Sequence, residues 1–96
     1  MGYKVVKLEK HRSSQCHVVL FDNGDISFYS YSTLVISAVC NKEENCYFLS
    51  CTGTYSQTTR RQISWFLKEY FPQLRYYHMR DIAATDSFIC VKCNKP

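Results

Sequence analysis

A basic and aromatic stretch between residues 59 and 80 contains the side chains best suited to bind a partner. Aromatic rings among cations anchor protein interfaces or stack on nucleic-acid bases, and cations attract carboxylates and phosphates. On a helix, Trp65 points toward its neighbours Arg61, Lys68 and Glu69 and away from the apolar stripe. The stretch therefore predicts one binding surface made of Arg60, Arg61, Trp65, Lys68, Arg75, Tyr76, Tyr77 and Arg80.

Two structural explanations of the same stretch stay open. A flanking segment, either Tyr76-Tyr77 or the N-terminal strand, would cover Trp65 and make the ring part of the packing. The cations would then form an ordinary solvated helix face, balanced in part by Glu69 and Asp81. Exposure of the Trp65 ring separates these explanations from a binding surface.

A cluster of hydroxyl side chains, Ser56, Thr58 and Thr59, precedes the helix. Helix N-termini bind anions through free N–H groups, and Arg60 and Arg61 would add positive charge there. The same residue types are common helix caps. Capping alone is the preferred interpretation.

The cysteines offer a weak metal pattern. The CxxC spacing at residues 90–93 lies in a β-like run, without the turn that a zinc knuckle needs, and Cys46 and Cys51 do not repeat the spacing. We predict no metal site. The N-terminal residues 1–12 lack the apolar run of a secretory signal, so we interpret the cysteines in β-like runs as thiols rather than disulfides: Cys16, Cys40, Cys46, Cys51 and Cys90.

Catalytic residue types are present but scattered. None of His11, His17 and His78 stands in a motif with a nucleophile or a paired carboxylate. Gly53 stands alone, so the sequence has no glycine-rich phosphate loop. We predict a protein without enzymatic activity and without a cofactor.

Composition limits the protein class. Ninety-six residues suffice for one hydrophobic core, so residues 1–96 are predicted to form a single domain. The formal net charge of +4 permits a nucleic-acid partner without requiring one. No segment approaches the ~20 apolar residues of a membrane span, and we expect a cytoplasmic protein without membrane association.

An amphipathic helix is predicted over about residues 59–71, where it would position the basic stretch. Thr59 and Gln62 have the spacing of a capping box, and Pro72 cannot continue the helix. Apolar side chains recur at helical spacing on one face, which must cover the sheet. This stripe consists of Ile63, Phe66, Leu67, Tyr70 and Phe71.

Two β-hairpins are predicted before the helix. Asn23-Gly24 between residues 16–21 and 26–31 is typical of a two-residue hairpin turn. That turn would place Val19 opposite Phe28 and would also oppose Asp22 and Asp25, a penalty that a four-residue loop avoids. The second hairpin is predicted from the apolar segments at residues 34–40 and 46–52, and 34–40 suits a central strand.

The remaining segments complete an α+β fold. Residues 3–8 and 87–92 read as the first and last strands of the chain, 73–77 as extended chain, and 79–84 as a short helical turn. The expected architecture is an antiparallel sheet of four to six strands, with one main amphipathic helix packed on one face.

Two short motifs resemble a family of small proteins from bacteriophages and mobile elements of bacteria. They are the Ser-Tyr-x-Thr-x-Val strand at residues 30–35 and the Tyr-Ser-x-Thr-Thr-x-basic helix start at 55–61, followed by Phe66-Leu67. Gln57, Gln62 and a C-terminal extension from about Pro72 depart from the family pattern. The resemblance implies phage or mobile-element origin and a family of unassigned function.

The predicted function follows from size, surface and resemblance together. We expect a non-enzymatic accessory protein in the cytoplasm of a bacterial host that binds a protein partner. Inhibition of a host factor or defence system, as by anti-CRISPR proteins, is one form of this activity. The alternative is a nucleic-acid-binding module that uses the same surface, and self-association through Trp65 or an edge strand stays open.

Overall fold

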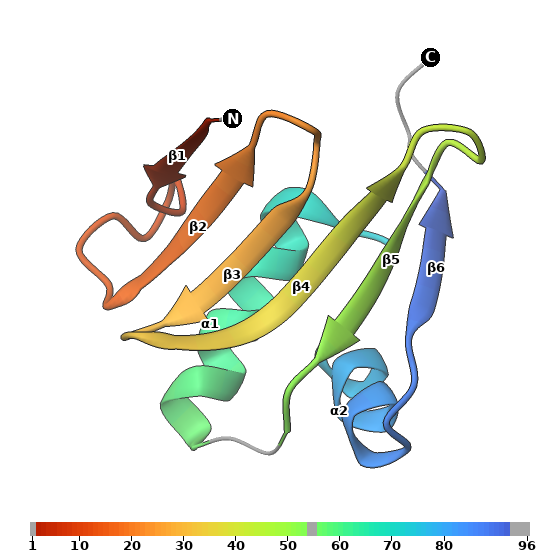
Figure 1. Cartoon of the computed structure of the whole chain (residues 1–96). Helices are drawn as coiled ribbons and strands as arrows, with labels where there is room; N and C mark the ends of the chain where they lie inside the picture. Colours follow the sequence, from red (N-terminus) through yellow and green to blue (C-terminus); the bar gives the residue numbers. More distant parts are fainter. Residues whose placement is uncertain (1, 54–55, 93–96) are drawn as a thin grey trace.

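The computed structural model describes residues 2–53 and 56–92, which form six strands and two helices. The strands are all antiparallel and neighbours in the sheet are neighbours in the chain, so their order is β1-β2-β3-β4-β5-β6 (Figure 1). The elements are β1 (Tyr3–Val6), β2 (Cys16–Phe21), β3 (Ile26–Ser30), β4 (Thr33–Asn41), β5 (Cys46–Cys51), α1 (Gln57–Tyr70), α2 (Tyr76–Ala84) and β6 (Ile89–Lys92).

The α+β class and the expected number of strands are confirmed, but the structure has two helices where one main helix was expected. In Figure 1, α1 crosses behind the sheet and α2 lies near one end of β5 and β6. Residues 73–77 are not extended, because α2 already begins at Tyr76. The first two residues of α2 are therefore the last two residues of the segment that was predicted to be extended.

The first hairpin is confirmed, but its predicted register is wrong by one residue. Val18 and not Val19 lies opposite Phe28, because a three-residue loop joins Phe21 to Asp25. Gly24 supplies a positive φ of 99° in this loop. The loop also separates the carboxylates: Asp22 accepts from the Gly2 amide at 2.8 Å, and Asp25 accepts from the Cys40 amide at 2.9 Å.

The one-residue difference decides which side chains form the core. Because side chains alternate along a strand, the observed register places Val18 and Phe28 together on the helical side, and both are fully buried. Tyr31 was expected at the end of β3 but lies in the turn to β4 with a φ of 57°. A bulge between Phe28 and Tyr29 accompanies this turn.

One hydrophobic core joins both helices to the sheet. The Phe66 ring of α1 stacks on the Phe28 ring of β3 with 4.6 Å between ring centroids, and the Tyr47 ring meets Phe71 edge-on at 5.3 Å. The predicted stripe of α1 is confirmed as a core face, with Tyr70 half-buried and the other four residues buried. Met79 and Ile82 add the buried face of α2.

α1 begins two residues before the predicted start. Ser56 is its N-cap and accepts from the Thr59 amide at 3.3 Å, so the predicted capping box of Thr59 and Gln62 is wrong. Gln62 is instead 2% exposed, and its Oε1 accepts from the Ser30 hydroxyl of β3 at 2.5 Å. The predicted end at Pro72 is confirmed, since the helix stops at Tyr70.

The other side of the sheet carries no helix among the described residues, and we refer to it as the open face. Its outward positions follow from the strand pairing. They are Tyr3, Val5, His17, Val19, Phe21, Ser27, Tyr29, Leu34, Ser37, Val39, Asn41, Cys46, Phe48, Ser50, Cys90 and Lys92.

Candidate binding site on the helical face

The cations of α1 stay on its solvent side because the apolar stripe turns the opposite side to the core. Arg60, Arg61 and Lys68 are exposed, as the helical periodicity predicts. Within residues 2–53 and 56–92, none of the three lies within ion-pair distance of a carboxylate. Their charge therefore remains available to a ligand.

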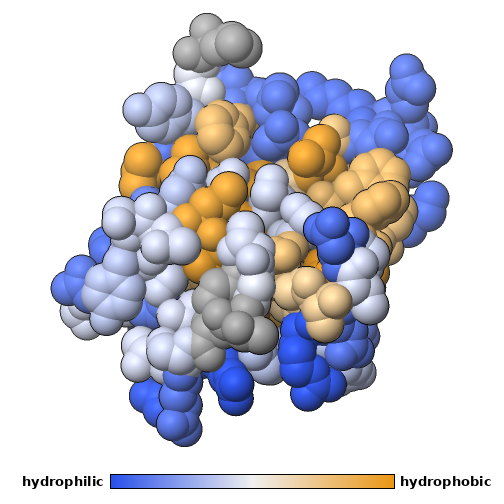
Figure 2. All heavy atoms as spheres, turned by 60° about the horizontal axis from the view of Figure 1, so that its bottom comes forward, coloured by the Kyte–Doolittle hydropathy of each residue, from blue (hydrophilic) through white to orange (hydrophobic). Residues whose placement is uncertain are grey.

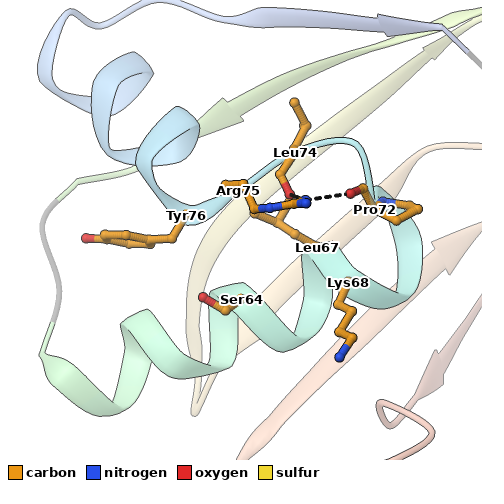
Figure 3. A pocket seen from close by; sticks show the side chains of 7 residues that line it. All are labelled: Ser64, Leu67, Lys68, Pro72, Leu74, Arg75 and Tyr76. Atoms are coloured by element: carbon orange, nitrogen blue, oxygen red, sulfur yellow. Dashed lines mark hydrogen bonds between the residues drawn. The ribbon is translucent and has the colours of Figure 1, made fainter.

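A groove of about 460 Å³ runs between α1 and the chain leading into α2. Figure 3 shows Arg75 at its centre, with the guanidinium turned toward Pro72 and with Lys68 extending away from it. The groove combines apolar walls with two cations. Its lining residues are Ser64, Leu67, Lys68, Pro72, Leu74, Arg75 and Tyr76.

Arg75 is held in place by the backbone of its own loop. Its Nη1 donates to the Pro72 carbonyl at 2.7 Å and to the Leu74 carbonyl at 3.2 Å. Its amide donates to Nδ1 of His78 at 2.9 Å, which caps the start of α2. The side chain thus loses little further freedom when it binds a ligand, which lowers the entropic cost of binding.

Arg60 and Tyr76 connect the two helices at the groove. The Arg60 guanidinium lies over the Tyr76 ring, with 5.9 Å between Cζ and the ring centroid. A cation at this distance is attracted to the face of the ring. Tyr76 therefore both lines the groove and attracts the Arg60 guanidinium to its ring.

Trp65 is half-buried rather than an open platform. The ring of His11, from the loop between β1 and β2, stacks on it at 3.7 Å between centroids and 7° between planes. The covering segment is thus neither Tyr76-Tyr77 nor the N-terminal strand, the two candidates expected from the sequence. No periodicity in the sequence indicates this contact, because it joins a loop to a helix far along the chain.

A second hollow of about 350 Å³ surrounds the stacked rings. Its walls come from the β1–β2 loop and from α1: Glu9, Lys10, His11, Trp65, Lys68 and Glu69. The Glu69 carboxylate accepts from the Glu9 amide at 2.8 Å and so ties the loop to the helix. Lys68 borders both this hollow and the groove, and it joins them into one surface.

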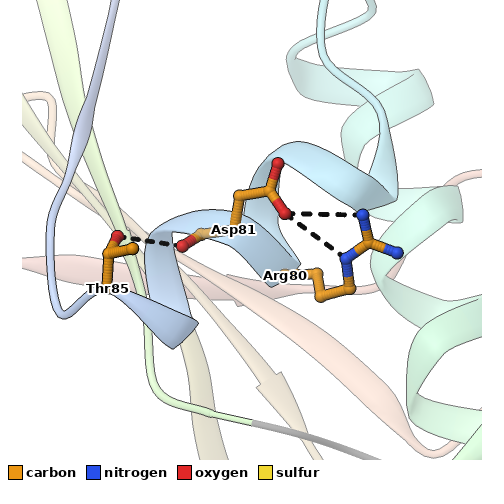
Figure 4. A network of polar contacts seen from close by, with 3 residues as sticks. All are labelled: Arg80, Asp81 and Thr85. Carbon is orange, nitrogen blue, oxygen red and sulfur yellow. Dashed lines mark hydrogen bonds and ion pairs between the residues drawn. The ribbon is translucent and has the colours of Figure 1, made fainter.

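Two predicted site residues lie apart from the groove. Arg80 pairs with Asp81 at 3.4 Å, and the Asp81 carbonyl accepts from the Thr85 hydroxyl (Figure 4). Both side chains of the pair are more than half exposed, so the pair stabilises α2 little. Tyr77 is 50% exposed, and its ring lies beside the His78 ring at 4.2 Å.

The structure thus brings together five of the eight predicted residues around the two hollows. Arg60, Trp65, Lys68, Arg75 and Tyr76 line or border them, whereas Arg61 stays on the exposed ridge of α1, and Arg80 and Tyr77 lie on α2. Sequence reasoning did not assign the other eight lining residues to the site, because their contribution depends on how loops and helices pack together: Glu9, Lys10, His11, Ser64, Leu67, Glu69, Pro72 and Leu74.

The hydroxyls at the start of α1 serve the helix and its contact with the sheet. Besides the cap, the Ser56 and Thr59 hydroxyls lie 3.2 Å apart, and the Thr59 hydroxyl lies 3.3 Å from that of Ser30. Thr59 is buried, with 8% of its surface exposed. These contacts agree with the preferred interpretation of the cluster as a cap.

The three histidines lie in different places. His11 stacks on Trp65, His17 stacks on Tyr29 at 5.1 Å across the open face, and His78 accepts from an amide at the start of α2. Each ring therefore has a structural neighbour of its own.

The cysteine pattern at 90–93 falls partly outside the described residues, since the structure describes the chain only to Lys92 in this region. Cys46 and Cys51 lie on opposite faces of β5, because their odd spacing reverses the side-chain direction. Burial raises the pKa of the Cys46 thiol to about 11, and the neighbouring Cys90 adds to the shift. Within the described ranges, no three potential metal ligands cluster.

Neither helix in the described part of the chain has the length and apolar content needed to cross a membrane. The comparison with curated proteins and the comparison with solved structures each gave no match. A family model described as a family of unknown function (DUF8033) matches residues 4–82. The match runs past Pro72 through α2 to Ile82, so this region is not an extension to the matched domain. The chain belongs to this family of unknown function.

Proposed function

We propose that this protein is a non-enzymatic accessory protein that acts by binding a protein partner through the groove between α1 and α2. The observation that supports this proposal most is the fixed guanidinium of Arg75 beside an apolar wall of Leu67, Pro72 and Leu74. Pre-organised cations next to apolar surface are typical of interface hot spots.

The partner segment has carboxylates flanking an apolar or aromatic side chain. The apolar side chain enters the groove, while the carboxylates meet Arg75, Lys68 and Arg60. Arg60 and Lys68 have no carboxylate within ion-pair distance in the part of the chain that the structure describes, so binding breaks no ion pair of theirs there. Complementary charge also accelerates the encounter of the two proteins.

We infer the biological setting from the resemblance to phage and mobile-element proteins. A small binding protein of that origin would work in the cytoplasm of a bacterial host and would inhibit a host factor or a defence system, as anti-CRISPR proteins do. This setting rests on the two short motifs at residues 30–35 and 55–61.

Capture from bacterial lysate, followed by affinity measurement with the purified partner, tests the proposal. Lys68→Glu is expected to weaken the affinity at least about tenfold, because it places a like charge opposite the partner's carboxylates. Lys42→Glu is the matched control, since it makes the same charge change at an exposed loop position far along the chain from the groove. Equal affinity of both variants for the same partner would exclude the groove as the binding site.

Nucleic-acid binding is a second candidate, and the local charge favours it. Residues 56–84 contain five cations and two carboxylates. Fluorescence anisotropy with single-stranded and double-stranded oligonucleotides distinguishes this candidate, because phosphate contacts make affinity fall steeply with salt. An absence of binding at low salt would rule it out.

A further inference from the structure

The open face exposes several large apolar side chains to solvent. Large apolar side chains are exposed on β1, β2 and β4: Tyr3 67%, Val5 56%, Phe21 39% and Val39 48%. Phe88, just before β6, is 63% exposed and meets Phe48 of β5 edge-on at 5.4 Å. A face of this kind marks an interaction site.

Figure 2 turns the bottom of the molecule forward and the front of Figure 1 upward. Apolar residues, in orange, gather in the central and upper part of this view, and hydrophilic residues surround them. The ring pairs on the open face also lie across neighbouring strands, as Tyr3 and Phe21 do at 6.2 Å. The apolar surface therefore extends over several side chains, and a hollow of about 490 Å³ lies beside Tyr3 and Phe21, with Asp22 in its wall.

Charge is nearly absent from the open face. Its sixteen outward strand positions include one lysine, Lys92, and no carboxylate. Nucleic acids and anionic membrane surfaces are bound through several cations, which this face lacks. The charged groups of a strongly charged protein would lose their hydration on this face without meeting groups of opposite charge. The fitting occupant is another neutral and apolar surface.

The size of the open face suits a second copy of the same chain. Six strands at about 4.8 Å spacing and about five residues at 3.3 Å rise give a projected area of about 500 Å². Side-chain relief and the flanking Phe88 make the accessible area larger than this projection, and a standard interface uses ~800 Å² per partner. A twofold axis through this face would place each apolar patch on its own equivalent.

We propose that the open face is a homodimer interface in which the sheets of two copies pack face to face. Sheets packed in this way lie about 10 Å apart with their strands at about 30°, which their twist dictates. Val39 lies on the inner strand β4 opposite Phe48 of β5, and would lie within the interface. The helical faces of both copies would remain exposed on opposite sides.

Sedimentation velocity and light scattering over a range of concentrations test this proposal on the full chain. The expected mass is twice the 11.3 kDa of the chain. Val39→Glu should raise the dimer dissociation constant about 100-fold or more, since it would bury a charge beside its symmetric equivalent. Gln73→Glu adds the same charge at an exposed position before α2 and should leave the dimer intact.

A second variant tests the same interface if Val39→Glu fails to fold. Phe88→Ser removes an exposed ring that precedes the β6 ladder, so it leaves strand pairing unchanged and should still weaken the dimer. A monomeric wild type at all concentrations would overturn the proposal. So would a dimer that both variants leave intact, or capture of a different protein on the open face in place of a second copy.

Discussion

The two sides of the sheet differ in charge and shape although one core supports both. The helical side presents exposed cations beside two hollows, whereas the open face has one charge among its outward strand positions and a hollow beside Tyr3 and Phe21. Exposed charge selects a complementary partner, while an apolar surface with little charge favours association with its own equivalent. The difference indicates that the two sides serve different contacts, which mutations can separate.

Loss of the Phe66 ring should have the largest effect, because this ring lies in the core that joins the sheet to the helices. Phe66 is fully buried and stacks on Phe28 and on Tyr70. Phe66→Ala should lower the free energy of unfolding by about 3–5 kcal/mol, as measured by urea denaturation. Tyr77→Ala, at a half-exposed ring, is the control. A loss below about 1 kcal/mol would show that the helical layer contributes little to the core.

The polar joint between the two layers should have the next largest effect. The Ser30 hydroxyl of β3 donates to Gln62 of α1 in a buried setting. Ser30→Ala and Gln62→Leu should each cost about 1–3 kcal/mol, since each alters one partner and leaves a buried polar group without its bond.

The double variant distinguishes this explanation from simple packing. Ser30→Ala combined with Gln62→Leu should cost less than the sum of the single changes, because both polar partners are then absent. Thermal or urea denaturation of all four proteins gives the coupling energy. Additive losses would mean that the bond does not couple the sheet to the helix.

Tyr31 offers a stabilising change on the sheet side. Its φ of 57° lies in the left-handed region, which costs a residue with a side chain roughly 1 kcal/mol, and its ring is 57% exposed. Tyr31→Gly should therefore raise the free energy of unfolding by up to about 1 kcal/mol. Ser32→Gly, at the next residue of the turn, is the control. A destabilised Tyr31→Gly variant would show that the ring contributes more by packing than the backbone costs.

The smallest predicted effect concerns pH and the open face. The raised pKa of Cys46 means that its thiol stays protonated in the folded protein after it ionises in the unfolded chain. The associated stability is complete below the ordinary thiol pKa of 9.0 and is lost as pH rises toward about 11. Cys46→Ala should therefore lose less thermal stability than wild type between these pH values. An equally steep decline in both proteins would assign the loss to other groups.

Local patterns in the sequence predicted the elements well. The apolar stripe of α1 and the stop at Pro72 depend on neighbouring residues, and the structure confirms both. The hairpin around Asn23-Gly24 is also confirmed, but its loop has three residues where two were predicted, which shifts the register by one. Asp22 accepts from the Gly2 amide and Asp25 from the Cys40 amide, and spacing within the turn does not indicate these distant partners.

The candidate site was predictable only in part. Periodicity around the helix was enough to place Arg60, Arg61 and Lys68 on the exposed side of α1. The groove depends on where α2 lies, and the cover of Trp65 depends on a loop that brings His11 to it. Such features arise from tertiary packing rather than from spacing in the sequence.

The order of the strands has a consequence for how the chain folds. The first five strands form successive hairpins, so each can add to its predecessor by closing a short loop. β6 can pair with β5 only after a long segment that contains both helices has been closed. We therefore expect β6 to join the sheet last, and its amides to exchange hydrogen with solvent before those of β3 and β4.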